Sequence, residues 1–189
     1  MMKPRFTPFF AFALLGVLAF ASCKDKEPTR TEFVFGTVCT INLYAAGTAE
    51  IQEEIFNRLR ELESILSANR DDTNIAAINR AAGIEPVKAA PETLQILKKA
   101  LLYREKTNGA FDPAIGPLVK LWNIGTEEAA VPSPEAIQSA ISLVNGKNVI
   151  IDEEAGTVFL AERGMRLDLG AIAKGYAADE AARIHSSHG

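Results

Sequence analysis

The spacing of apolar residues changes several times along the chain, and each change predicts a different element. The stretch 32–44 is rich in β-branched and aromatic residues with Gly36 inside it, which predicts a strand pair or one bulged strand. From Thr48 onward, apolar residues recur at three- and four-residue steps, which predicts a long amphipathic helix packed on a sheet. The apolar positions of this helix are Ile51, Ile55, Leu59, Leu62 and Leu66.

Two helices are expected next. A short helix begins at Asp72 or Thr73 and stops at Gly83. Its inward side carries Ile75 and Ile78. A longer helix has Pro91 in its first turn and ends near Asn108-Gly109. Its apolar side consists of Leu94, Leu97, Leu101 and Leu102.

The last third of the chain mixes helices and strands. A fourth helix is expected over 133–144, because Ser133-Pro134-Glu135 provides a cap and a first-turn proline. Its apolar residues are Ile137, Ile141 and Val144. Two strand-like runs, 148–152 and 157–161, should pair as a hairpin. The run 165–169 alternates like a strand and leads through Gly170 into a helix that reaches about His185. This order of elements predicts an α+β fold rather than a doubly wound sheet.

Composition and charge narrow the class of protein. The chain has 189 residues, of which 48% are hydrophobic and 23% charged, so it can bury a core and is not disordered, collagen-like or a coiled coil. Its length fits one domain or the first part of a larger one. The net charge is −4 and there is no long Lys/Arg run, so the chain lacks the positive charge pattern of a general nucleic-acid binder.

The N-terminus predicts export. Residues 1–22 combine Lys3 and Arg5, an apolar run and small residues, which is the three-part pattern of a signal peptide. A membrane-spanning helix is the alternative, but the apolar run is shorter than a bilayer requires. Cys23 then fits a bacterial lipobox, although Phe20 stands where that motif usually has Leu. We therefore expect a lipid on Cys23, a polar tether over 23–31 and a folded domain over 32–189.

With Cys23 acylated, no internal disulfide is expected, because Cys39 is the only other cysteine. Cys39 lies in an apolar, strand-like run, where a lone cysteine is usually a small core residue. A nucleophilic thiol is the alternative.

The first candidate site is the segment 167–179, where a predicted strand enters a helix through Gly170. Unpaired backbone N–H groups at a helix start, small residues around them and the charge of Lys174 suit a phosphate or pyrophosphate. The segment follows neither the P-loop pattern nor G-x-G-x-x-G. A packed turn with a solvated lysine is an equally simple interpretation.

Two other segments carry polar groups beside irregular backbone. Over 107–122, two Gly and two Pro residues fix an irregular backbone around Asp112, which either accepts hydrogen bonds from a base or ribose or only caps a helix. Over 62–72, Asn69 closes the long helix, where it is either a site residue or a C-terminal cap. His185 and His188 have no cysteine or carboxylate at ligand spacing, so a metal site there is not expected.

Taken together, these segments occur in the order seen in the ApbE-type flavin transferases, formerly called thiamine biosynthesis lipoproteins, which the chain resembles. The matching segments are the lipoprotein start, Phe35-Gly36-Thr37, Leu66-Ser67, Ile78-Asn79, Gly109-Ala110-Phe111-Asp112-Pro113, Gly116-Pro117-Leu118, Leu121-Trp122 and 168–176. The resemblance implies an α+β fold with a mixed, largely antiparallel sheet and packed amphipathic helices.

The resemblance also implies an activity and a set of site residues. The activity is Mg²⁺-dependent cleavage of FAD, with FMN joined through its phosphate to a Thr hydroxyl of a partner protein and AMP released. Residues implied to contact FAD are Phe35, Asn69, Ala110, Phe111, Asp112, Asp168 and Lys174, with Asn69 against the flavin ring and Lys174 near the pyrophosphate. Ala171 would offer its backbone carbonyl to Mg²⁺.

The resemblance further implies that the chain is C-terminally truncated, because the side-chain magnesium ligands of the family, an Asp and a Thr, lie in the region that would follow Gly189. Two other functions stay open on these residues. One is an FAD pyrophosphatase that gives free FMN and AMP, and the other is a non-catalytic FAD-binding lipoprotein. The expected location is the bacterial cell envelope, anchored to the membrane and facing the periplasm or exterior.

Overall fold

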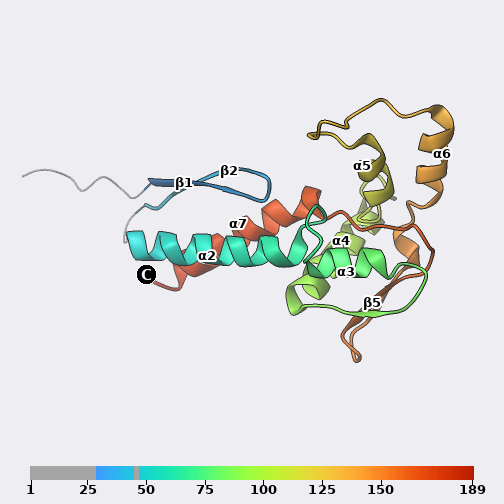
Figure 1. The fold of residues 1–189 in the computed structure, drawn as a ribbon. Coiled ribbons are helices and arrows are strands. Elements are labelled where there is room, and N and C mark those ends of the chain that lie inside the picture. Colours follow the sequence, from blue (N-terminus) through green and yellow to red (C-terminus); the bar gives the residue numbers. More distant parts are fainter. Residues whose placement is uncertain (1–28, 45–46) are drawn as a thin grey trace, which may run out of the picture.

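The computed structural model describes residues 29–44 and 47–189 (Figure 1). The signal peptide over 1–22 and the lipid on Cys23 fall outside these residues. The elements, in chain order, are β1 (Thr29–Val34), β2 (Thr37–Asn42), α2 (Ala49–Leu66), α3 (Asn74–Arg80), β3 (Val87–Lys88), α4 (Pro91–Lys106), α5 (Gly116–Trp122), α6 (Pro134–Ser142), the 3₁₀ turn η1 (Gly146–Asn148), β4 (Val149–Asp152), β5 (Thr157–Leu160) and α7 (Gly170–Ser186).

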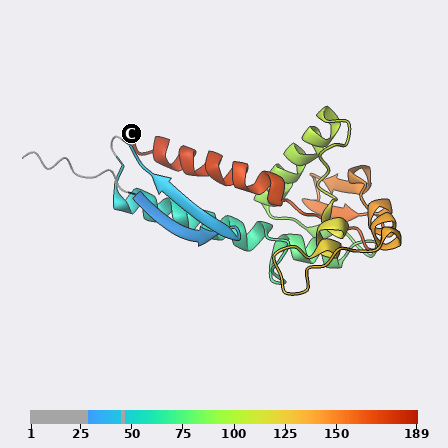
Figure 2. The same ribbon diagram turned by 90° about the horizontal axis from the view of Figure 1, so that it is seen from above.

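The molecule is elongated, with α2, α7 and the β1–β2 hairpin at one end and the remaining elements at the other (Figure 1). Helices α2 and α7 lie side by side in antiparallel directions, and the β1–β2 hairpin lies along α2 (Figures 1 and 2). The start of α7 and the end of α2 therefore meet in the middle of the molecule, next to α3 and α4. Within the described residues no helix is both long and apolar enough to cross a membrane.

The first predicted strand region is a strand pair. β1 and β2 are antiparallel and in continuous register from Thr29↔Asn42 to Val34↔Thr37, so the bulged-strand alternative does not apply. The turn consists of Phe35 and Gly36, whose φ angles are 56° and 66°. Two consecutive positive φ values are typical of the tight turns whose twist matches a hairpin. Because β1 begins at Thr29, residues 29–31 belong to this strand and not to the expected tether.

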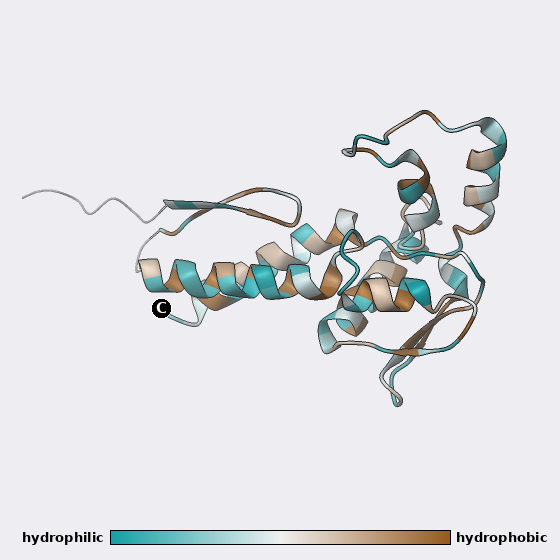
Figure 3. Ribbon diagram, viewed as in Figure 1, coloured by the Kyte–Doolittle hydropathy of each residue, from teal (hydrophilic) through white to brown (hydrophobic). Residues whose placement is uncertain are grey.

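The long helix α2 forms where the apolar spacing predicts it. The Thr48 hydroxyl accepts a hydrogen bond from the Ile51 N–H and so caps the helix start. The five predicted apolar positions are all buried, and Phe56 adds a large, fully buried side chain to the same face. Apolar and polar residues alternate along this helix (Figure 3), as packing on one face requires.

Helices α3 and α4 confirm the predicted starts but not every predicted face. Thr73 caps α3 and places Ile75 and Ile78 in the core. In α4, Leu97 is fully buried as expected, but Leu102 is 47% exposed, so its assignment to the apolar side is wrong. The buried face of α4 consists of Thr93, Ile96, Leu97 and Ala100. This face is turned by about one residue because α4 packs against α2 and α7 at once.

The fold is α+β with antiparallel pairing, as predicted, but the strands form two small sheets. β1 and β2 form one sheet, and the other has the order β3-β5-β4 with both pairs antiparallel. Helix α6 also begins at the predicted cap, Ser133, although its buried residue is Ala140 while Ile141 is 44% exposed. Here the expectation that Ile141 faces the core is wrong.

The run 165–169 is not a strand of either sheet, which corrects the prediction from its alternation. Its burial does alternate, since Met165, Leu167 and Leu169 are each at most 1% exposed. Its backbone instead pairs with a loop, through an isolated parallel bridge between Ile115 and Arg166. Alternation reports which side chains face the core, whereas a strand also needs a neighbouring strand to pair with.

An ion-pair network links the helices that carry this arrangement. The Arg58 guanidinium of α2 donates to Glu92 of α4 at 3.0 Å and to Glu180 of α7 at 3.2 Å. Hydrogen bonds from Arg183 and then from Arg58 hold the pKa of the Glu180 carboxyl below its usual value. Arg58 thereby connects three helices at a side chain that is only 20% exposed.

The corrected face of α4 gives a first testable prediction. Leu97→Ala should lower the free energy of unfolding by about 2–4 kcal/mol, because it leaves a cavity in a fully buried position. Leu102→Ala, the same substitution in the same helix, should cost less than about 0.5 kcal/mol. Urea unfolding of both variants measures the difference, and equal losses would contradict the assigned face.

Candidate functional site

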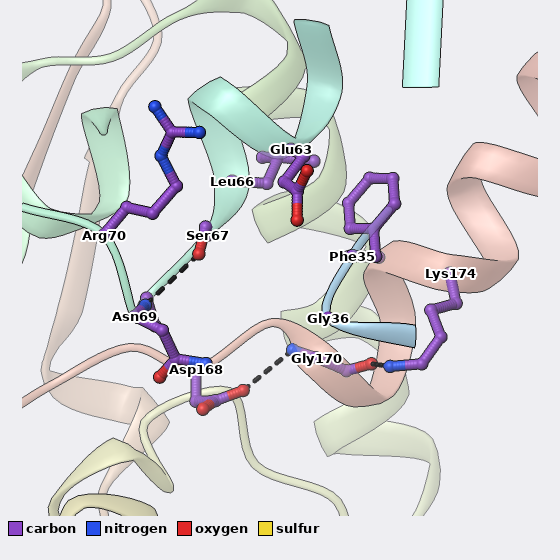
Figure 4. A pocket seen from close by; sticks show the side chains of 12 residues that line it. Phe35, Gly36, Glu63, Leu66, Ser67, Asn69, Arg70, Asp168, Gly170 and Lys174 are labelled. Atoms are coloured by element: carbon purple, nitrogen blue, oxygen red, sulfur yellow. Dashed lines mark hydrogen bonds between the residues drawn. The ribbon is translucent and has the colours of Figure 1, made fainter. Parts of the chain in front are cut away.

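A pocket of about 200 Å³ opens where the end of α2, the β1–β2 turn and the start of α7 meet (Figure 4). Four residues implied by the resemblance line it, namely Phe35, Asn69, Asp168 and Lys174. Its other lining residues are Gly36, Glu63, Leu66, Ser67, Ala68, Arg70, Gly170 and Ala173. Segments more than a hundred residues apart in the sequence therefore form a single site.

Asn69 reaches the pocket because α2 ends just before it. The C-terminal cap of α2 is Ser67, whose N–H donates to the Glu63 carbonyl, so the alternative in which Asn69 caps the helix is wrong. The backbone N–H of Asn69 donates to the Ser67 hydroxyl at 3.3 Å. Its side chain amide is left to face the pocket.

Asp168 and Gly170 form the floor at the start of α7. The Asp168 Oδ1 atom accepts a hydrogen bond from the Gly170 N–H at 2.8 Å. This bond satisfies one backbone donor at the helix start and fixes the direction of the carboxylate. A Cβ atom at Gly170 would lie 3.0 Å from the same Oδ1 atom, so a side chain there would crowd the carboxylate.

Lys174 is the cation of the pocket without a carboxylate partner. Its Nζ atom donates only to the Gly170 carbonyl, at 3.3 Å, and among the described residues it makes no ion pair. Arg70, in contrast, is paired with Asp72 at 2.8 Å. A positive charge one turn into α7, beside the helix N-terminus, favours an anionic ligand such as a phosphate.

The structure does not bring the 110–112 segment into this pocket. The Asp112 carboxylate is bound internally, by Arg104 at 2.6 Å, the Gly146 N–H at 2.9 Å and the Ala114 N–H at 2.8 Å. Phe111 packs against the core and Ala110 is exposed. The capping interpretation of Asp112 is the one that these bonds support, and FAD contact by the three residues stays a prediction.

Ala171 lies beside the pocket, in the first turn of α7. Within the described part of the chain, no group of three or more His, Cys, Asp or Glu side chains could hold a metal ion. A magnesium ion normally takes carboxylate, phosphate and water oxygens around it. The residues present therefore do not by themselves fit a magnesium site, and the role of the Ala171 carbonyl stays a prediction.

A larger cleft, which was not expected from the sequence, adjoins the pocket. This cleft has a volume of about 600 Å³ and shares Gly36, Ala68, Asn69 and Asp168 with the pocket. Lys120 of α5 and Arg166 also line it, and neither side chain makes an ion pair within the described residues. Asn123 and Gly125 line this cleft with positive φ angles, and an Asn and a Gly so close together are the local sequence feature that indicates a turn here.

Cys39 lies in β2, after the hairpin turn, and packs against the core. Burial, and after it the nearby charge of Glu32, raises the pKa of its thiol. A raised pKa keeps the thiol protonated at neutral pH and lowers its nucleophilicity. Both observations favour the packing role over the nucleophilic one.

Comparison with known proteins shows the family of the chain. The family model of the ApbE family matches residues 35–189. The chain belongs to the ApbE family. It is 42% identical to the FAD:protein FMN transferase of Treponema pallidum, over 86% of this chain and 48% of that protein. It is 38% identical to an FAD:protein FMN transferase of Klebsiella pneumoniae, over 77% of this chain and 46% of that protein.

Solved structures of the ApbE family share the fold. The ApbE protein of Thermotoga maritima superposes with a TM-score of 0.80 at 32% identity, over 86% of this chain and 53% of that one. The flavin transferase ApbE of Vibrio cholerae superposes with a TM-score of 0.74 at 26% identity, over 86% of this chain and 54% of that one. The chain thus spans about half the length of the relatives it matches.

The two aspartates offer a test of the site geometry. Asp112→Ala should lower the free energy of unfolding by about 2–4 kcal/mol, because it leaves the Arg104 guanidinium and two backbone donors without their partner. Asp168→Ala removes one capping bond and should cost about 1 kcal/mol. Urea unfolding compares the two, and a larger loss for Asp168→Ala would contradict the structural role of Asp112.

Proposed function

We propose that this chain forms the flavin-binding part of an FAD:protein FMN transferase. In the proposed reaction, the hydroxyl oxygen of a Thr side chain on a partner protein attacks the phosphorus of the FMN half of FAD. The bond between this phosphorus and the bridging oxygen breaks, AMP leaves with that oxygen, and the hydroxyl proton passes to water. The observation that carries the proposal is the convergence of Asn69, Asp168 and Lys174 on one pocket.

The pocket combines apolar surface with positive charge. Phe35 and Leu66 provide apolar surface in the same pocket as the Asn69 amide, which suits one end of a flavin ring. Lys174 and the first turn of α7 provide positive charge for a pyrophosphate. In a site from which water is excluded, such fixed charges stabilise negative charge that develops on the leaving phosphate.

The size of the pocket indicates that FAD extends beyond it. Ligand sites for small molecules usually measure about 300–1,000 Å³, and this pocket has about 200 Å³. The adjoining cleft of about 600 Å³ begins at residues that the two cavities share. Together they provide space for a dinucleotide, with Asp168 at the boundary.

Magnesium belongs to the same proposal. Mg²⁺, when bound beside a pyrophosphate, would neutralise its oxygens, and Ala171 is the ligand we assign from this chain. The described residues provide no carboxylate site for this ion.

We also assign the protein to the bacterial cell envelope, anchored through a lipid on Cys23. The mass of the protein purified from membranes tests this anchor, since an unmodified Cys23 would contradict it.

The Lys174 charge gives the test of the proposed function. Lys174→Ala should weaken FAD binding at least tenfold, because the pyrophosphate loses its cation in a partly enclosed pocket. Lys98→Ala is the matched control, since Lys98 is an exposed lysine whose partner, Glu153, lies outside the pocket. Flavin fluorescence during titration with FAD measures both affinities, and equal binding by the two variants would overturn the role of Lys174.

The products decide the reaction. The protein is incubated with FAD, Mg²⁺ and a candidate acceptor protein, and AMP is measured by chromatography while bound FMN is measured by fluorescence after denaturing electrophoresis. AMP together with acceptor-bound FMN supports the transferase. AMP with only free FMN would establish a pyrophosphatase, and FAD binding without AMP would establish a non-catalytic flavin protein.

A further inference from the structure

The backbone of Leu167 is buried, and it belongs to a segment that does not pair with a strand of either sheet. Leu167 is fully buried, and neither of the two sheets includes the run 165–169. A buried N–H and C=O that lack hydrogen bonds are strongly unfavourable. The partner is Asn79, the penultimate residue of α3, whose side chain is itself almost completely buried.

Asn79 pairs with both polar groups of the Leu167 backbone. Its Nδ2 atom donates to the Leu167 carbonyl at 3.0 Å, and its Oδ1 atom accepts from the Leu167 N–H at 2.6 Å. A side-chain amide has one donor group and one acceptor on the same planar end. The Asn79 amide therefore does for Leu167 what a neighbouring strand would do.

The residues on either side of Leu167 are held from a loop instead. The Asp168 N–H donates to the Pro113 carbonyl at 2.9 Å, and the Gly116 N–H donates to the Arg166 carbonyl at 3.1 Å. In an extended chain, the backbone groups of successive residues point to opposite sides. The segment is thus fixed between the 113–116 loop and Asn79, and it cannot slide along its own axis without breaking bonds on both sides.

This clamp acts on the pocket through the next residue. Asp168 lines the pocket and holds the Gly170 N–H, and Gly170 begins the helix that carries Lys174 (Figure 4). None of the atoms of Asn79 lines the pocket. Asn79 does not line the adjoining cleft either, whereas Arg166, Leu167 and Asp168 do, so an effect of Asn79 on a ligand passes through the position of this segment, of which Asp168 is the residue that lines both cavities.

We propose that Asn79 is a positioning residue of the flavin site, which fixes Asp168 against FAD by clamping the Leu167 backbone. The proposal rests on the proposed function, because it assumes that FAD binds in this pocket. It assigns Asn79 a role in ligand affinity in addition to its contribution to stability.

Asn74 provides a matched control in the same helix. Its Nδ2 atom donates to the Lys88 carbonyl at 2.9 Å and its Oδ1 atom accepts from the Ala90 N–H at 2.9 Å. Asn74→Ala thus removes the same two kinds of hydrogen bond as Asn79→Ala, at the end of α3 away from the Leu167 backbone. The two variants differ in which backbone segment is released.

The experiment measures FAD affinity by flavin fluorescence, at a temperature where thermal unfolding shows each variant to be folded. Asn79→Ala should weaken FAD binding at least fivefold relative to Asn74→Ala. If Asn79→Ala does not fold, Asn79→Asp decides by the same threshold, because it keeps the acceptor oxygen and loses only the donor to Leu167. If FAD affinity falls less than fivefold in Asn79→Ala, or in Asn79→Asp where Asn79→Ala does not fold, the proposal is overturned.

A double-mutant cycle separates positioning from general loosening of the fold. If Asn79 acts through Asp168, then Asn79→Ala should change FAD affinity by less than twofold in the Asp168→Ala background. Effects that multiply would contradict the proposal. A wild-type protein that does not bind FAD would overturn the proposed function together with this inference, whereas wild-type binding with unaffected Asn79 variants overturns the inference alone.

Discussion

The packing of α7 against α2 determines where the polar groups of the pocket lie. Phe35, Asn69 and Lys174 come from three separate segments, and each segment is placed by one of these two helices or by the hairpin that lies along α2. The buried face of α7 consists of the small residues Ala173 and Ala177 together with the larger Tyr176 and Ile184, which pack into the core between the helices. Arg58 then links α2 to Glu180 and, through Glu92, to α4.

Local signals in the sequence were enough to predict most elements of this arrangement. Capping by Thr48, Thr73 and Ser133, together with the three- and four-residue spacing, located the starts of three helices correctly. What failed were assignments that depend on partners distant in sequence. Leu102 follows the apolar spacing of α4 as well as Leu97 does, and only the packing of α4 on two other helices decides which of them is buried.

The site shows the same division between local and distant information. Asp168, Gly170 and Lys174 are close in sequence, and a strand-to-helix turn with one lysine is recognisable without a structure. Asn69 could be assigned only by resemblance, since its local sequence fits a cap equally well. The cleft between the α5 region and Arg166 depends on a contact between segments about 50 residues apart, for which a single sequence carries no pattern. The long-range bonds of Asn79 are hidden for the same reason.

Phe35 shows how the fold accepts a local cost to build the pocket. A non-glycine residue with a φ of 56° pays about 1 kcal/mol relative to glycine, because its Cβ approaches the following carbonyl. The continuous register of β1 and β2 requires a two-residue turn at this point, and Gly36 fills only one of its positions. A glycine at both positions would relieve the strain but would remove the aromatic wall that faces Asn69 and Lys174. The strained residue is the one whose side chain the pocket uses, which agrees with the general tendency of backbone strain to occur at functional sites.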